Sequence, residues 1–356
     1  MRGLLALGFW VLVLMGCRPA DDALATHRLL VMATWIDLSL PQDALQHEPE
    51  LIASIEAELR RFEHDYYAWG DGELAALNRA LTETGRFEAS EGLAALLLTS
   101  QDIASTTDGA FDPGVGALVE LWGFHTGEPP SVPPDDDAIV MTLETFGSIA
   151  SLVIDVNRID GLTPIEVSPT GDRHLARPFR LDLGGIAKGA AVDRIVELLA
   201  ESGVTPALIN AGGDLRVVGT PTNRNWRIGI QAPRSDEVLG TIELNPGEAA
   251  FTSGDYERYF ELDGQRLHHI LDPRNGRPVT HTQAVSIIAA DGTTADAAAT
   301  ALFVAGPDEW RAVAHALGIE SVLRVDATGV IEMTAPMRDR FQLSAGVSSD
   351  IIVAAD

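Results

Sequence analysis

Apolar positions recur along the chain at helical spacing in several separate stretches. Ser90 is a favourable N-cap residue for one of the predicted helices. Pro307 is a good first helical residue and predicts that a second helix opens there. The pattern predicts helices at about 49–65, 90–105, 115–124, the stretch after Gly189, and about 294–304.

Shorter apolar runs rich in β-favouring residues predict strands, and these are too many for single βαβ units. Asp263-Gly264 is a strong hairpin turn, and Asp326-Ala327-Thr328-Gly329 predicts another. Residues 126–138 read as a surface loop, and 158–180 as loop-rich with one or two strands. We therefore predict an α+β fold and not a doubly wound sheet. The predicted strands are 29–40, 207–211, 215–218, 226–230, 241–244, 256–262, 266–271, 284–290, 321–325 and 330–334.

Composition and charge narrow the class of protein. The chain has 356 residues, enough for one large domain or two ordinary ones, and 46% hydrophobic content indicates a globular protein. A formal net charge of −27 argues against a nucleic-acid partner, because phosphates would be repelled.

The first residues are typical of an export signal. Arg2 precedes an apolar run, Leu4–Met15, that is too short to span a bilayer as a helix. Leu14-Met15-Gly16-Cys17 resembles a bacterial lipoprotein signal, with Cys17 as the lipidated residue; a plain signal peptide is the alternative. Cys17 is the only cysteine, which excludes disulfides in the mature chain, zinc fingers and cysteine catalysis.

Residues 181–189 (LDLGGIAKG) indicate a ligand site. A short apolar strand ending near an acid is expected to run into glycines and then a helix. Glycines at such a corner let backbone N–H groups approach a ligand, and Lys188 could add a cation, an arrangement suited to a diphosphate. A simple structural turn is the alternative.

Asp296 and Thr300 are four residues apart and share one face of a predicted helix that is otherwise nearly all alanine. A carboxylate and a hydroxyl on a small-residue face suit Mg²⁺, which prefers oxygen ligands. Alternatively, Asp296 favours the helix N-terminus and Thr300 bonds back to its own helix.

Two further stretches carry polar side chains at turns. His269, in the run His268 to Gly276, is the natural general base, since an ordinary imidazole titrates near neutrality. Turn chemistry with surface histidines is the alternative there. Phe251 to Tyr256 (FTSGDY) offers hydroxyls at a glycine, but no Gly-x-Ser-x-Gly pattern surrounds Ser253, so a structural turn is expected.

These motifs occur in a characteristic order, and that order resembles the ApbE family of FAD:protein FMN transferases. The resemblance covers roughly residues 28–345. Its members imply a two-layer, T-fold-related α+β domain, Mg²⁺, FAD as substrate, and transfer of FMN to a threonine hydroxyl with release of AMP. The motifs are Met32-Ala33-Thr34, Gly72-Glu73-Leu74 with Asn78, residues 108–113, 121–124, 181–189, 210–214, 252–256, 269–276 and 295–300.

The resemblance also assigns residues. It implies cation ligands at Gly185, Asp296 and Thr300, and a proton acceptor at His269 or Asp272, with Asp255 as a further candidate. It implies FAD contacts at Met32, Ala110, Phe111, Asp112, Asp182, Lys188 and Ile270. Ala68, between Tyr67 and Trp69, stands where family members commonly carry an aromatic residue, Asn275 replaces a threonine and Ala190 a tyrosine.

The predicted organisation is a signal peptide at 1–16, a tether at 17–27, the flavin transferase domain at 28–345 and a tail at 346–356. The partners expected are FAD and an acceptor protein with an Asp-Gly-x-Thr-Ser/Thr segment, as in a membrane redox complex, with no nucleic acid. Localisation is expected at the periplasmic side of a membrane, the inner one favoured, through the lipid on Cys17. An FAD diphosphatase and a non-catalytic flavin-binding lipoprotein are the alternatives.

Overall fold

The structure is a computed structural model that describes residues 24–126, 132–155, 165–170, 177–221, 224–347 and 349–353. The expected signal peptide and Cys17 lie outside these ranges, so their interpretation stays a prediction. Within these ranges, no helix combines the length and the apolar character needed to cross a bilayer.

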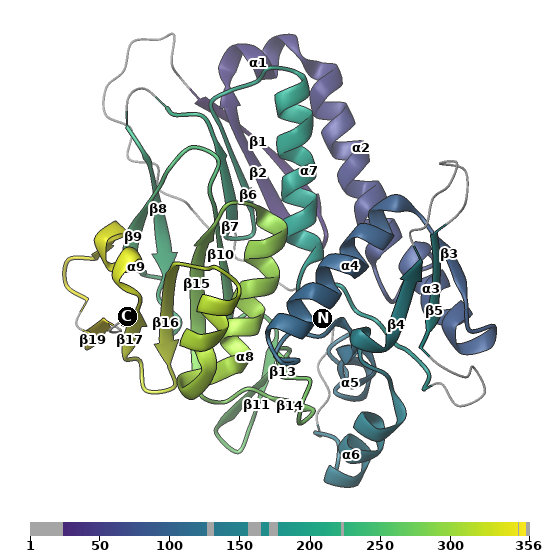
Figure 1. Cartoon of the computed structure of the whole chain (residues 1–356). Coiled ribbons are helices and arrows are strands. Elements are labelled where there is room, and N and C mark those ends of the chain that lie inside the picture. The colour runs from purple at the N-terminus through teal and green to yellow at the C-terminus, as the bar shows by residue number, and fades with distance from the viewer. Residues whose placement is uncertain are drawn as a thin grey trace, which may run out of the picture.

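Nine strands of the described chain form a central sheet, in the order β1-β2-β6-β7-β10-β15-β16-β17-β19 (Figure 1). Neighbouring strands run antiparallel, except for β17 and β19, which pair in parallel. The strands are β1 (Leu24–Val31), β2 (Thr34–Pro41), β6 (Ala207–Ala211), β7 (Asp214–Val218), β10 (Ala249–Gly254), β15 (Thr282–Ala289), β16 (Ser321–Asp326), β17 (Ile331–Met333) and β19 (Ile351–Val353).

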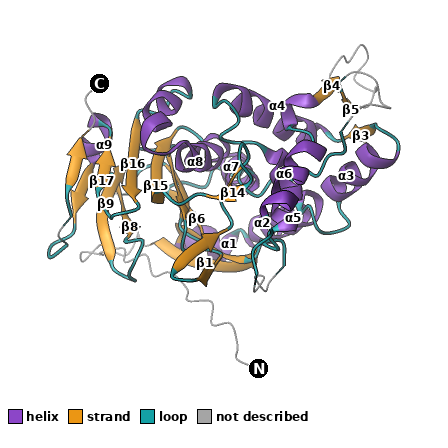
Figure 2. Cartoon of the chain, turned by 90° about the horizontal axis from the view of Figure 1, so that it is seen from below, coloured by secondary structure: helices purple, strands orange, loops and turns teal. Residues whose placement is uncertain are grey.

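Helices cover one face of this sheet, and the two layers enclose the largest apolar core (Figures 1 and 2). Helix α8 lies on β10 and β15, and α7 packs beside it. The helices are α1 (Gln42–His47), α2 (Pro49–Tyr66), α3 (Glu73–Glu83), α4 (Glu91–Thr106), α5 (Gly116–Leu121), α6 (Asp136–Thr145), α7 (Ala187–Glu201), α8 (Gly292–Ala316) and α9 (Ala335–Arg340), with short 3₁₀ turns η2 (Pro113–Val115) and η3 (Ile149–Ser151).

The opposite face of the central sheet packs on a small sheet in the order β18-β9-β8, which encloses a second apolar core. The fold thus consists of a helical layer, the central sheet and the small sheet. The predicted α+β fold is confirmed. The remaining strands are β8 (Trp226–Gln231), β9 (Val238–Leu244) and β18 (Phe341–Leu343); β3 (Phe87–Ala89), β4 (Leu152–Asp155) and β5 (Ile165–Pro169); β11 (Tyr259–Leu262) and β12 (Gln265–His268); β13 (Leu271–Asp272) and β14 (Arg277–Pro278).

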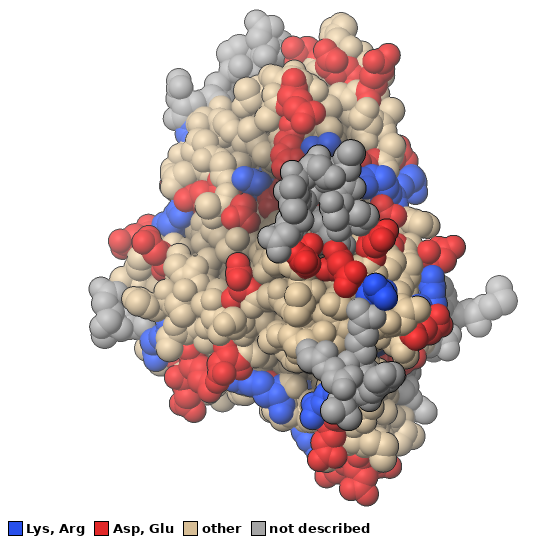
Figure 3. Space-filling view, turned by 45° about the vertical axis from the view of Figure 1, so that its right-hand side comes forward, with Lys and Arg blue, Asp and Glu red and all other residues tan. Residues whose placement is uncertain are grey.

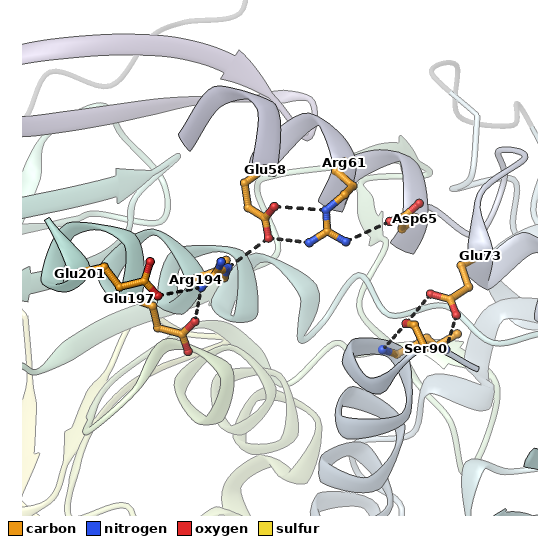
Figure 4. A network of polar contacts seen from close by, with 9 residues as sticks. Glu58, Arg61, Asp65, Glu73, Ser90, Arg194, Glu197 and Glu201 are labelled. Atoms are coloured by element: carbon orange, nitrogen blue, oxygen red, sulfur yellow. Dashed lines mark hydrogen bonds and ion pairs between the residues drawn. The ribbon is translucent and has the colours of Figure 1, made fainter. Parts of the chain in front are cut away.

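Polar contacts tie the helices of the covering layer together (Figure 4). Arg194 of α7 donates to Glu58 of α2 over 3.1 Å, and Glu58 also accepts from Arg61 of its own helix over 2.6 Å. At the start of α4, the Ser90 hydroxyl accepts the Leu93 N–H, so the predicted N-cap is confirmed. The bond between Arg194 and Glu58 joins α7 to α2.

The surface agrees with the acidic composition. Acidic side chains are spread over the face drawn in Figure 3, with basic side chains between them. The sequence has 52 acidic and 25 basic residues, so a phosphate backbone would meet net repulsion.

Local turn signals predicted several boundaries correctly. Asp263-Gly264 joins β11 to β12, and the turn after Asp326 joins β16 to β17. Within α8, Gly306 has φ of 70°, a left-handed conformation that ends one helical segment before Pro307 opens the next. The predicted second opening at Pro307 is therefore confirmed.

The prediction of one strand over 29–40 is wrong. The segment is a hairpin, and its turn residues Met32 and Ala33 both have positive φ, at 56° and 55°. Glycine, asparagine or aspartate normally marks such a turn, because other side chains are strained there. Since none of these three residues is present at 32–33, the sequence contained no indication of a turn.

Other local predictions also need correction. The Phe251–Tyr256 stretch, expected as a turn, is largely β10 in the middle of the central sheet, where alanines and hydroxyl residues face both layers. The loop predicted over 126–138 ends earlier than expected, because α6 begins at Asp136 and the Asp135 carboxylate caps it by accepting the Ala138 N–H. The sheet also extends beyond 28–345: β1 begins at Leu24, and β19 adds 351–353 to its other edge.

Candidate active site

The glycine corner, residues 181–189, is held from outside by a side chain. Asn78 of α3 donates to the Leu181 carbonyl over 2.9 Å and accepts the Leu181 N–H over 2.8 Å. The short strand predicted at the start of this corner is therefore wrong, because an amide side chain bonds to Leu181 where a neighbouring strand would. The Asp182 N–H donates to the Pro113 carbonyl, and its carboxylate accepts the Gly184 N–H. These bonds fix the corner before α7 begins at Ala187.

Helix α8 presents Asp296 and Thr300 to this corner. The Gly189 N–H donates to Asp296 Oδ2 over 2.9 Å, and a Cβ atom on Gly185 would lie 3.4 Å from Thr300 Oγ1. The residues around Asp296 on α8 are buried alanines, which lets the two elements approach closely. The structure thus brings Gly185, Asp296 and Thr300 together, although they come from segments more than 100 residues apart.

A third element, β10, reaches the same place. Ser253 Oγ lies 3.3 Å from Thr300 Oγ1, within hydrogen-bond distance. Phe111 also borders the corner, since its Cε2 would lie 3.4 Å from a Cβ atom on Gly185. Sequence reasoning placed Ser253 in a structural turn because the pairing of β10 with β15 leaves no local signal.

Lys188 pairs with Asp214, the first residue of β7. Burial disfavours the charged lysine, but attraction to Asp214 and Asp296 outweighs it and raises the Lys188 pKa above its ordinary value. The Asp214 carboxylate also accepts the Thr252 N–H over 3.0 Å. Sequence reasoning missed this pair, although an acid directly after Asn210-Ala211-Gly212-Gly213 was a signal that could have been used.

Burial raises the pKa of Asp296 to about 7, with the nearby Asp214 charge adding to the effect and Lys188 opposing it. In this largely buried space the Asp214 and Asp296 carboxylates face one ammonium, that of Lys188. A further cation would relieve this imbalance. Among the described residues, there is no group of three or more His, Cys, Asp and Glu side chains that could hold a metal ion by themselves. A cation here would need hydroxyl and backbone oxygens beside Asp296.

The two adjacent histidines have different roles. His268 is buried; its Nε2–H donates to the Val279 carbonyl over 2.6 Å and its Nδ1 accepts the Ile270 N–H, so the ring is neutral and structural. His269 Nδ1–H donates to the Arg258 carbonyl over 3.3 Å, which leaves Nε2 as the basic nitrogen. Burial and the Arg258 charge hold the His269 pKa well below its ordinary value.

The two carboxylates considered with His269 are both engaged. Asp272 accepts from the Arg274 N–H and guanidinium and from the Asn275 amide, over 2.9 to 3.1 Å. Asp255 is buried and accepts two 2.6 Å bonds from Arg234. Of the three proton acceptors considered, His269 has the free basic atom.

The remaining predicted FAD contacts lie on several elements. Met32 is at the tip of the β1–β2 hairpin, and its N–H donates to Glu63. Ala110 and Ile270 are buried. Asp112 accepts the Gly114 and Ile149 N–H groups over 2.7 and 3.0 Å, so it closes the turn into η2.

The aromatic residues flanking Ala68 differ in their surroundings. Ala68 is buried and Tyr67 is exposed. Trp69 is covered by the Arg180 guanidinium, 4.5 Å from its ring centre, and by the His125 ring at 4.7 Å. Tyr67 thus presents the more accessible ring of the two.

Comparison with known proteins agrees with this arrangement. The family model described as the ApbE family matches residues 32–323, a range that contains the whole site described above. This chain belongs to the ApbE family.

Relatives and solved structures that are similar to it carry related names. An FAD:protein FMN transferase of Rhodobacter capsulatus is 37% identical over 328 residues, covering 92% of this chain and 60% of the relative, so the chain spans about three fifths of that protein. The crystal structure of the ApbE protein of Thermotoga maritima matches with a TM-score of 0.77 and 32% identity, covering 89% of this chain and 99% of that one. The apo flavinyl transferase ApbE of Pseudomonas stutzeri matches with a TM-score of 0.75 and 29% identity, covering 92% of this chain and 98% of that one.

Proposed function

We propose that this chain is an FAD:protein FMN transferase that uses Mg²⁺. The observation that carries the proposal is the meeting of Gly185, Asp296 and Thr300, with Ser253 beside them. Family membership supplies the reaction: the FMN half of FAD is transferred to a threonine hydroxyl of an acceptor protein and AMP is released.

The donors at this place fit Mg²⁺. They are hard oxygen atoms: one carboxylate, one or two hydroxyls and the backbone carbonyl of Gly185. Three or four protein donors leave room for water and phosphate oxygens, which Mg²⁺ usually keeps in nucleotide sites. Asp296 would supply the charge, Thr300 and Gly185 the neutral oxygens. A bound Mg²⁺ would neutralise negative charge on the diphosphate and increase the electrophilicity of its phosphorus.

The chain's own groups account for the remaining steps. Phosphoryl transfer depends mainly on alignment and charge stabilisation. The His269 Nε2 atom accepts the proton of the acceptor hydroxyl as a new O–P bond forms to the FMN phosphorus. The O–P bond to the AMP half then breaks, and AMP leaves with the bridging oxygen. Nδ1–H stays on the Arg258 carbonyl and orients the ring.

The experiment is incubation of the protein with FAD, Mg²⁺ and an acceptor that carries an Asp-Gly-x-Thr-Ser/Thr segment. Fluorescent acceptor in a denaturing gel supports transfer, and an acceptor with that threonine changed to alanine is the control. AMP without labelled acceptor would identify the FAD diphosphatase instead, and unchanged FAD would identify a flavin-binding protein. Excess EDTA should stop the reaction if Mg²⁺ is required.

Localisation is part of the proposal. Cys17 in Leu14-Met15-Gly16-Cys17 would carry a lipid that anchors the protein at the periplasmic side of a membrane, the inner one favoured, near a redox-complex subunit that serves as acceptor. Labelling cells with a radioactive fatty acid tests this step. A Cys17→Ser variant should lose the label and leave the membrane fraction.

A further inference from the structure

The first turn of α8 is bonded to a carboxylate from another helix. Asp193 of α7 accepts the Gly292 N–H over 2.7 Å at Oδ1, and the Thr293 N–H and hydroxyl over 2.8 and 2.7 Å at Oδ2. The helix also has its own N-cap, since Asp291 accepts the Thr294 N–H. Asp193 therefore does more than satisfy free N–H groups: it joins α8 to α7.

Arg216 of β7 holds this carboxylate. One guanidinium nitrogen donates to Asp193 Oδ1 and another to the Ala290 carbonyl over 3.3 Å, two residues before α8 begins. Arg216 thus bonds both to Asp193 and to the chain that enters α8. The side chains of Asp193 and Arg216 are only 18% and 17% exposed, so water screens this pair less than a surface pair.

Helix α7 and strand β7 are also joined by a second ion pair, in which the helix supplies the cation and the strand the carboxylate. On β7, Asp214 and Arg216 are two residues apart and lie on one face of the strand. On α7, Lys188 meets Asp214, and Asp193 meets Arg216. A lateral shift of α7 along β7 would separate both pairs. Because the order of charges along α7 is the reverse of the order along β7, both ion pairs form in only one position of α7 on the sheet.

This position decides where Asp296 lies. Thr293 and Asp296 are three residues apart on α8, so a helix held at Gly292 and Thr293 also holds Asp296 opposite the Gly189 N–H. Thr300 follows one turn later and lies against Gly185 and Ser253. The Asp193 bonds are thus adjacent to the site, although Asp193 has no place among its donors.

We propose that Asp193, held by Arg216, is a positioning residue that sets the separation of α7 and α8 at the cation site. This inference rests on the proposed Mg²⁺ site. Asparagine at 193 would keep one acceptor oxygen but turn a donor toward one of the two N–H groups. The α8 segment stays buried among apolar residues, so the helix persists while its first turn is released.

The test is Mn²⁺ binding by the FAD-loaded protein, read from the loss of the electron paramagnetic resonance signal of free Mn²⁺, with FAD alone subtracted. Asp193→Asn should weaken Mn²⁺ binding by about tenfold or more, the usual effect of removing a group that orients metal ligands. Asp326→Asn is the matched control: its carboxylate also accepts backbone N–H groups and a threonine hydroxyl, but in the β16–β17 turn. The control should bind Mn²⁺ within about twofold of the wild type.

Arg216→Lys is a second variant in case Asp193→Asn does not fold. It keeps the positive charge but cannot bond to Asp193 and the Ala290 carbonyl through a planar group, and Mn²⁺ affinity should fall several-fold. In both variants, the KM for Mg²⁺ should rise more than kcat falls. Loss of thermal stability with unchanged Mn²⁺ affinity would overturn the inference. A wild-type protein that binds no Mn²⁺ would instead overturn the proposed site on which the inference depends.

Discussion

Gly189 of α7 lies against Gly292 of α8 so closely that a Cβ atom on Gly189 would be 2.0 Å from the Gly292 carbonyl oxygen. The N–H of the same Gly189 bonds to Asp296. Gly189 thus makes both the backbone contact with Gly292 and the hydrogen bond to the Asp296 carboxylate. Glycine is required here by the close approach of two backbones, since the helical conformation itself needs none.

Gly189→Ala should therefore force the two helices apart. Because the obstacle is backbone and not a flexible side chain, we expect a loss of about 1–3 kcal/mol in the free energy of unfolding and a large loss of Mg²⁺-dependent AMP release. Thermal or urea unfolding and an AMP assay measure the two effects. Gly229→Ala is the control, because its Cβ atom would lie at an ordinary 3.4 Å from Val238. A Gly189→Ala protein with normal stability and activity would contradict the observed packing.

Asp296→Ala should abolish metal-dependent turnover while the protein stays folded. The carboxylate is buried and its pKa is raised to about 7, so its removal relieves an unfavourable charge. Losing the charged ligand should reduce AMP release by about 10²-fold or more, since it removes several kcal/mol of transition-state stabilisation. Full activity in this variant would end the assignment of Asp296 to the cation.

His269→Ala should slow transfer by about 10²–10⁴-fold, the usual contribution of a general base, with little change in FAD affinity. Fluorescence titration measures binding and gel fluorescence of the acceptor measures transfer. A matched His268→Ala change should instead lower stability, because His268 is buried and bonded at both ring nitrogens. Loss of FAD binding in His269→Ala would make it a binding residue.

The acid side of the pH profile gives a separate test of His269. Its pKa lies well below the ordinary value of about 6.5, so the ring remains neutral, and able to accept a proton, as the pH falls through that value. At saturating Mg²⁺, which would keep the Asp296 carboxylate ionised, we expect kcat/KM for the acceptor to stay flat between about pH 8 and 6.5. A decline centred near 6.5 that disappears in His269→Ala would show an ordinary imidazole pKa.

Asp255→Asn should separate a structural role from a catalytic one. The carboxylate is bound by both ends of the Arg234 guanidinium, so we expect a stability loss of about 1–3 kcal/mol and a transfer rate within about tenfold of the wild type. In an Arg234→Gln background the stability loss should be smaller, because the partner is already gone. A rate loss beyond 10²-fold at full stability would restore Asp255 as a candidate base.

Much of the site could be predicted from short motifs. Asp296 and Thr300 are four residues apart, so a predicted helix was sufficient to place both side chains on the same face. Gly185 could be linked to them only through the family resemblance. The pairs Lys188–Asp214 and Asp193–Arg216 were missed, because each joins residues 23 or more positions apart.

The sequence by itself determined the features that depend on residues only a few positions apart. The Ser90 cap, the Asp263-Gly264 hairpin and the helix opening at Pro307 depend on near neighbours, and all three were predicted. The tertiary structure alone decided the turn at Met32-Ala33, the place of β10 in the sheet and the extended segment held by Asn78. In each, a distant segment supplies the hydrogen bonds or the packing that outweigh the local preference, and no local pattern records that segment.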